Sequence, residues 1–293
     1  MKLIKPSFEI WEQPAGLEGV YKQIEKVGRV CYKSEDKITE DSAKPFVDRM
    51  IKSGHGAMLE HGTVYLQFFW AGAVCQQCNQ TAPNKLLDRY AGNKYSIVHY
   101  HGNDVYVTTN LRVLVENNWL GDLKYICEPT EYHERRVTVH FVCDRGVSHE
   151  FVRHRVMSFA QESTRYCNYS KDKFGNELTF IQPCWLDDER LKLYGPYHTI
   201  IRDKSPESIF IANLNNAERD YLDLIGLGWK PQEARAVLPN SLKTELVVTG
   251  FTSDWNHFFD LRARGTTGAP HPQAKELAEP LMREFIARNY INN

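Results

Sequence analysis

The chain has 293 residues, of which 42% are hydrophobic and 25% are charged, and its formal net charge is -1. This composition supports a substantial folded core and excludes an intrinsically disordered chain. The near-zero charge excludes a global positive field for a nucleic-acid backbone or an anionic membrane, so any anion site has to be local. No apolar run approaches the roughly 18 residues that a membrane helix needs.

The first residues and the cysteines indicate a cytoplasmic protein. Charged residues interrupt the apolar ones at the start, so we expect no signal peptide. The seven cysteines are an odd number and are scattered, which predicts reduced thiols. The single CxxC motif, Cys75 to Cys78, lacks the second pair of ligands that a zinc site requires, so we expect ordinary packing there.

The first half of the chain predicts a helix, a strand and a hairpin. Residues 39–53 have the apolar spacing of an amphipathic helix, and Gly54 is placed to end it. Residues 63–70 form a β-rich apolar run. Two alternating segments, 95–100 and 105–109, flank turn-forming residues and predict a β-hairpin.

The middle of the chain predicts a helix, a strand and a second helix. The first helix is expected from Asn110, and residues 137–143 alternate as a strand. Residues 144–146 end that strand, and Ser148 is the candidate N-cap of the helix that follows.

The C-terminal part predicts three helices. Ser205 is an N-cap, Pro206 occupies the first helical position, and the apolar spacing beyond them supports a long helix. Two further helices are expected over about 253–264 and 272–290, the second containing Pro280.

These elements indicate an α+β fold. Helices do not alternate strictly with strands, and the strands are joined by a hairpin, which predicts a mixed, largely antiparallel sheet with packed helices. No repeat or linker divides the chain, so we interpret residues 1–293 as one domain.

The densest polar cluster lies at residues 153–166. It reads Arg-His-Arg at 153–155 and, after five mostly apolar residues, Gln-Glu-Ser-Thr-Arg-Tyr at 161–166. Burying a guanidinium without a partner costs several kcal/mol, so we expect this cluster to bind an anion. The anion could be a ligand. Alternatively, the arginines pair with Asp144, Glu150 and Glu162 in a structural network.

Two other arginines favour the interpretation that the anion is a ligand. Arg262 follows Trp255, Phe258 and Phe259 at the spacing of one helix face, so it lies on a stripe that we expect to be packed in the core. Arg235 is set among small and apolar residues before a proline. Arginine's planar fork suits bidentate recognition of a phosphate or a uracil edge. Several converging arginines could hold a nucleotide phosphate without a large net charge.

Other common phosphate and catalytic motifs are absent from the sequence. Neither the GxGxxG fingerprint nor the P-loop signature occurs, which excludes the two most familiar phosphate-binding loops. An HExxH motif for a metal is missing, and Ser163 lacks the GxSxG elbow of serine hydrolases.

Four motifs, in this order, resemble those of the flavin-dependent thymidylate synthases. The Arg-His-Arg run, followed after seven residues by Ser163, resembles the signature of that family. His55 followed by Glu60 resembles its amino-terminal flavin segment, and residues 234–239 and 258–262 resemble its two further arginine motifs. The four together span most of the chain.

The resemblance implies conversion of dUMP to dTMP by a homotetramer whose active sites are built from several subunits. FAD would be the cofactor, with NADPH and 5,10-methylenetetrahydrofolate as co-substrates, and no metal is implied. The residues implied for dUMP are Glu150, Arg153, Gln161, Ser163, Arg165, Arg235 and Arg262. Those implied for FAD are His55, Glu60, Arg153, His154, Arg155 and His257.

The chain departs from the family pattern at three of its positions. Many relatives carry Glu where Gln161 stands and Gln where Glu150 stands, and Ala57 replaces a hydroxyl residue.

The resemblance also suggests how the chemistry is divided. No cysteine lies within the signature, and the nearest is Cys167. We therefore expect reduced flavin to supply the hydride and the protein to supply orientation and charge. Arg262 would stabilise negative charge on the pyrimidine, and Ser163 would position the nucleotide rather than attack it.

Two other classes of function stay open. One is a non-catalytic nucleotide- or RNA-binding module that stacks bases on Tyr166 and Tyr169 beside the arginines. The other is a metal-dependent nucleotide hydrolase built on His55, Glu60 and His61.

Overall fold

A four-stranded antiparallel sheet lies at the centre of the molecule. The structure, a computed structural model, describes residues 1–69, 89–102, 104–186, 188–193 and 204–292. The strands of this sheet follow the order β2-β6-β9-β7, which makes β2 and β7 its edges. Their bounds are β2 (Ser7–Trp11), β6 (Arg136–Asp144), β7 (Ser158–Gln161) and β9 (Lys243–Phe251).

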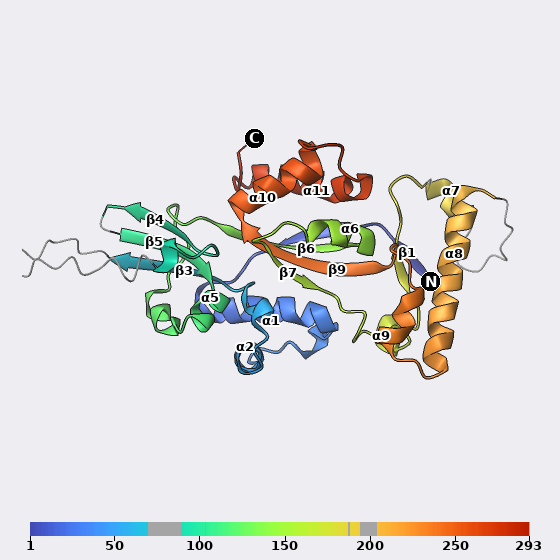
Figure 1. Ribbon diagram of the computed structural model, residues 1–293, viewed down its shortest axis with the longest axis horizontal. Coiled ribbons are helices and arrows are strands. Elements are labelled where there is room, and N and C mark those ends of the chain that lie inside the picture. The colour runs from blue at the N-terminus through green and yellow to red at the C-terminus, as the bar shows by residue number, and fades with distance from the viewer. Residues whose placement is uncertain (70–88, 103, 187, 194–203, 293) are drawn as a thin grey trace, which may run out of the picture.

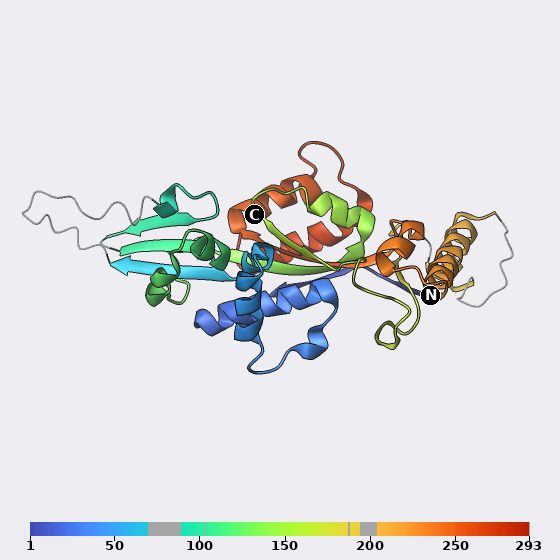
Figure 2. The same cartoon turned by 60° about the horizontal axis from the view of Figure 1, so that its bottom comes forward.

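Helices cover both faces of this sheet, as the two views agree (Figures 1 and 2). One face, here called the aromatic face, carries α6 (Arg145–Phe151), α10 (Thr252–Phe259) and α11 (Pro272–Ala287). The opposite face, here called the α1 face, is covered by α1 (Gly16–Tyr32), and α2 (Ala43–Lys52) packs against α1.

The two faces follow from the alternation of side chains along β6 and β9. Phe141 and Val248 are buried beneath α10 on the aromatic face. His140 and Glu245 are each out of phase with these two, and they lie on the α1 face, where His140 stacks on the Trp11 ring at 4.7 Å. One antiparallel pair of long strands, β6 and β9, therefore carries an apolar surface on one side and polar side chains such as His140 and Glu245 on the other.

A second sheet projects from one end of the molecule (Figure 1). Its order is β3-β5-β4, with both neighbouring pairs antiparallel. Its core continues into α1 and α2, which ties it to the central sheet. The elements of this region are α3 (Gly56–Leu59), β3 (Thr63–Phe69), β4 (Ile97–His101), β5 (Asp104–Asn110), α5 (Leu111–Glu116) and the 3-10 turn η2 (Leu120–Tyr125).

A third group of elements lies at the other end. β1 (Lys2–Ile4) pairs in parallel with β8 (Thr179–Ile181), beside the long helix α8 (Pro206–Gly226). The short elements are the 3-10 turns η1 (Glu35–Lys37), η3 (Asp172–Phe174) and η4 (Arg235–Val237), the π-helical turn η5 (Asp260–Arg264), and the helices α7 (Asp188–Leu193) and α9 (Pro231–Ala234).

The predicted α+β class and most predicted elements are confirmed. β4 and β5 form the expected hairpin, and Gly102 at its turn has a φ of +59°. The Ser205 side chain accepts a hydrogen bond from the Ser208 amide at the start of α8, as an N-cap should. Of the predicted strand at 63–70, the last residue lies outside the described residues, as do Cys75 and Cys78 of the CxxC motif.

Some expectations were wrong or incomplete. Ser148 is not the N-cap of α6, because the Asp144 carboxylate accepts the Val147 amide at 2.8 Å and takes that role. The helix expected at 39–53 begins only at Ala43. The strands β2, β7 and β9 and the helix α1 were not predicted at all.

Candidate functional site

The predicted site residues lie around the edge strand β7. Glu150 is in α6 on the aromatic face, Gln161 ends β7, and α3, which follows His55, contacts β7. The turn that leads into β7 contains Val156 with a φ of +80°. A β-branched residue is a genuine outlier there, and such strained residues gather at functional sites.

Arg262 is the centre of a compact group on the aromatic face. Its Nη1 donates to a Glu150 carboxylate oxygen at 2.6 Å, and its Nη2 donates to the Glu150 carbonyl at 2.9 Å. Its Nε donates to Nε2 of His154 at 3.1 Å. Three of the five N–H donors of this guanidinium are thereby fixed, which leaves two for a ligand. The aromatic residues Trp255, Phe258 and Phe259 beneath it are buried, as expected.

His154 is held neutral in this group. Burial, the neighbouring Arg262 charge and His257 together lower the pKa of His154 to about 4. A neutral ring is what allows Nε2 to accept from Arg262. The ring of His257 lies 6.0 Å from that of His154 and is exposed.

Gln161 is tied down inside the protein. Its side-chain amide donates to the hydroxyls of Ser148 at 2.8 Å and of Thr244 at 3.2 Å. Ser148 therefore supports the end of β7 rather than the start of α6.

The turn after β7 brings a second group together. The Ser163 hydroxyl accepts the Arg165 amide at 3.3 Å, and the Ser163 amide donates to the Cys31 carbonyl at 3.0 Å. Arg235 reaches the same turn, since its Nη1 donates to the Thr164 hydroxyl at 3.2 Å.

Among the described residues, the exposed arginines of the signature form no ion pair. The side chains of Arg153, Arg155 and Arg165 are all exposed. The proposed structural network with acidic residues is wrong for them. Glu150 pairs instead with Arg262, Glu162 pairs with Lys243, and Asp144 accepts from the Val147 amide and from Gln273.

The segment before β3 does not form a metal site. His55 is exposed, Glu60 pairs with Arg112, and His61 is buried with Nδ1 at 2.8 Å from the Thr249 hydroxyl. Burial and the nearby Arg136 charge lower the pKa of His61 to about 3. Within the described ranges no group of three His, Cys, Asp or Glu residues could hold a metal ion.

The base-stacking interpretation is also weakened. Tyr166 is 58% exposed and could stack on a base, but Tyr169 is buried and its hydroxyl donates to Glu162.

No helix in the described part of the chain has the length and apolarity to cross a membrane.

The cysteines near the signature are poor nucleophiles. Burial raises the pKa of Cys31 to about 11 and that of Cys167 to about 12, so both are thiols at neutral pH. The five described cysteines are free, as expected for reduced thiols.

The structure thus places the predicted residues in three groups around β7. They are the Arg262 group, the turn at 163–165 with Arg235, and the segment 55–60. No hydrogen bond or ion pair between described side chains joins one group to another. Sequence reasoning missed Arg112 and Lys243, although Glu60 and Glu162 in the motifs were a signal that each needed a cation.

Comparisons with known proteins point to one family. Residues 130–288 match the family model of the thymidylate synthase complementing proteins. A flavin-dependent thymidylate synthase from Pyrococcus furiosus is 31% identical over 149 residues, which are 51% of this chain and 53% of that protein. One from Mycolicibacterium gilvum is 34% identical over 149 residues, 49% of this chain and 54% of that protein.

The chain spans about half the length of the curated relatives it matches. Among solved structures, the UMP/dUMP methylase PolB from Streptomyces cacaoi, bound with 5-Br dUMP, aligns over 98% of this chain and 93% of that one. Its sequence identity is 18% and its TM-score is 0.43, too low to support a conclusion. The family match covers more than half of the chain, so the protein belongs to the thymidylate synthase complementing protein family.

Proposed function

We propose that the protein is a flavin-dependent thymidylate synthase. It would convert dUMP to dTMP, with 5,10-methylenetetrahydrofolate as the one-carbon donor and NAD(P)H-reduced FAD as the hydride source. The relatives that carry this name support the reaction class. The structural observation that supports it most directly is that Arg153, Arg155 and Arg165 are exposed and have no acidic partner among the residues that the structure describes.

The dUMP site would combine the Arg262 group with the turn at 163–165. Arg165 and Arg235 would bind the phosphate, because planar guanidinium groups match its oxygens in pairs. Ser163 would position the nucleotide. Arg262, with two N–H donors left, would stabilise negative charge that develops on the pyrimidine ring.

The residues implied for FAD fit it in part. Arg153, Arg155, His55 and His257 are exposed and could hold its pyrophosphate and ring. His154 and Glu60 are committed to Arg262 and Arg112, so they would act by holding those neighbours. Bound and reduced, the flavin would supply a hydride to the reaction. The protein would orient the substrates and exclude water.

A homotetramer would complete the site. The three groups are separate within one chain, and among the described residues no strand pairs with the outer edge of β7. A neighbouring subunit at this edge would bring its own arginines to the nucleotide. Active sites shared between subunits therefore suit the arrangement of this chain.

Transfer of label from methylene-folate to dUMP tests the proposal. The purified protein should be yellow, and label should reach dTMP only with FAD and NADPH present. A colourless protein that cannot be reconstituted with flavin, yet binds uridine nucleotides without turnover, would contradict it and favour a binding module.

A further inference from the structure

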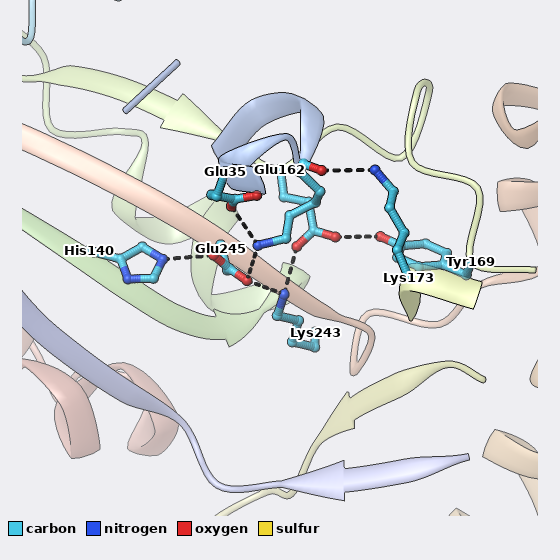
Figure 3. Close-up of polar contacts among 8 residues, drawn as sticks. Glu35, His140, Glu162, Tyr169, Lys173, Lys243 and Glu245 are labelled. Atoms are coloured by element: carbon cyan, nitrogen blue, oxygen red, sulfur yellow. Dashed lines mark hydrogen bonds and ion pairs between the residues drawn. The ribbon is translucent and has the colours of Figure 1, made fainter. Parts of the chain in front are cut away.

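A chain of ions, half-buried except for the buried Glu162, lies on the α1 face of the central sheet, and the proposed reaction does not use it (Figure 3). It runs from Lys33 through Glu245 and Lys243 to Glu162 and is here called the ion chain. Lys33 Nζ lies 2.8 Å from Glu245, and Lys243 bridges Glu245 and Glu162, the latter at 2.9 Å. His140 adds a further contact to Glu245 at 2.9 Å.

The ion chain contains two lysines and two glutamates, and each charge has an opposite partner. Glu35, at the more exposed end, gives Lys33 a second carboxylate at 2.8 Å. The carboxylates offset burial and raise the pKa of Lys243 above its ordinary value, so its charge is kept. Replacing such ion pairs by well-packed apolar residues is often neutral for stability, so we interpret these ions by the geometry that they impose.

The ion chain ends on the signature turn. Glu162 is 2% exposed and stands between Gln161 and Ser163. One carboxylate oxygen accepts from Lys243, and the other accepts from the Tyr169 hydroxyl at 3.0 Å. The Glu162 amide donates to the Glu245 carbonyl at 2.8 Å. The start of the turn is therefore fixed both through the Glu162 carboxylate and through the Glu162 backbone amide.

The other end of the ion chain is anchored at a strained residue. Lys33 is the C-cap of α1 and has a φ of +48°. Glycine or asparagine is usual at such a left-handed helix end. The sequence places a lysine there instead. Its ammonium group donates to Glu245 of the ion chain at 2.8 Å, and its carbonyl accepts from Lys173 at 2.8 Å.

We propose that Lys33, Lys243 and Glu162 are positioning residues that fix the turn at 163–165 for the uracil nucleotide. This inference rests on the proposed function and deepens it. The ions touch neither substrate nor flavin. They set the places of the Ser163 hydroxyl and the Arg165 guanidinium.

Lys243→Met is the first test. Glu162 then keeps a buried charge without its cation, and the turn shifts. We expect the KM for dUMP to rise by about tenfold or more while kcat changes by less than about threefold, the pattern of lost binding. Glu177→Gln is the matched control, because Glu177 lines one cavity together with Lys33, Glu162 and Lys243 but is not part of the ion chain.

A double variant separates positioning from general damage. Glu162→Gln together with Lys243→Met removes both charges, so no buried ion is left alone. We expect it to recover much of the dUMP affinity lost in Lys243→Met. Lys33→Gly should relieve the backbone strain, keep the melting temperature and still raise the KM for dUMP.

The outcomes distinguish this inference from the proposed function. A KM for dUMP that is the same in Lys243→Met as in Glu177→Gln would overturn the inference alone. So would a rise in KM that comes only with loss of flavin and of thermal stability and is not rescued in the double variant. Wild-type protein that neither converts dUMP nor binds it in equilibrium dialysis would overturn both.

Discussion

The two faces of the central sheet are built from the same pair of strands, but one contributes apolar packing and the other contributes ion pairs and hydrogen bonds. On the aromatic face, Trp255 and its neighbours form a buried apolar platform that carries Arg262 at its margin. On the α1 face, individual ion pairs and hydrogen bonds of residues such as Glu245 and Thr249 connect the elements. Apolar packing is non-directional and tolerates some repacking, whereas ion pairs lose their value when one partner moves. Bulk stability and local geometry are therefore supplied from opposite faces of one sheet.

Arg262→Ala should give the largest effect on activity. We expect turnover of dUMP to fall by at least about a hundredfold, as when a donor to developing charge is removed. Flavin should stay bound. Arg264→Ala is the control, because Arg264 lies in the same turn and pairs with Asp260 at the surface. Near wild-type turnover of Arg262→Ala would refute its role.

Trp255→Ala tests the platform of the aromatic face. Its side chain is fully buried, and its ring N–H donates to the Val137 carbonyl at 3.1 Å. We expect a loss of about 4 kcal/mol in unfolding free energy, measured by denaturant titration. His257→Ala on the exposed side of the same helix should change it by less than about 0.5 kcal/mol. Equal losses would show that the platform is not the source of stability.

Glu245→Gln tests the opposite face. The carboxylate accepts from Lys33, Lys243 and His140, and its loss leaves Lys33 with Glu35 and Lys243 with Glu162 as their remaining carboxylate partners. We expect a loss of about 3 kcal/mol in unfolding free energy, because several charge-assisted hydrogen bonds are lost together. Glu279→Gln, an exposed partner of Arg283, is the control. A variant as stable as the wild type would mean that the ions are not coupled to folding.

Acid should weaken the protein partly through His154. Its pKa is lowered to about 4 in the folded protein, so between the ordinary value of about 6.5 and 4 the unfolded chain binds the extra proton. Stability is therefore lost as the pH falls through this window, by about 2 to 3 kcal/mol for this group. In His154→Gln, the slope of the unfolding free energy against pH should decrease in this window by the equivalent of about one bound proton. An unchanged slope would contradict the buried neutral ring.

Ser163→Ala should have the smallest effect. The hydroxyl accepts the Arg165 amide within the turn, and loss of one such bond costs about 0.5–1.5 kcal/mol. We expect dTMP formation to fall by no more than about tenfold. Complete loss of turnover with dUMP still bound would revive Ser163 as a nucleophile.

The sequence predicted the aromatic face far better than the α1 face. Trp255, Phe258 and Phe259 repeat at helical spacing, and such a pattern survives without knowledge of the partners. β9 was missed because Lys243 and Glu245 make its first half polar, although both side chains point to one face. Ion pairs between residues more than two hundred positions apart leave no periodic trace.

The site was predicted unevenly for a related reason. Motifs named the arginines, but their environments depend on packing. Arg262 turned out to be held by Glu150 and His154, whereas Arg165 stayed exposed. Which carboxylate meets which arginine is decided in three dimensions.

The helix α1 stands outside the stretch shared with the family, and yet it closes one side of that stretch. A fragment trimmed to residues 130–288 would uncover Ala160 and Val247 and strip the Cys31 carbonyl from Ser163. Apolar side chains on the α1 face of its sheet would then be exposed to water. A shortened or grafted version of this protein would therefore have to keep the amino-terminal helix together with residues 130–288.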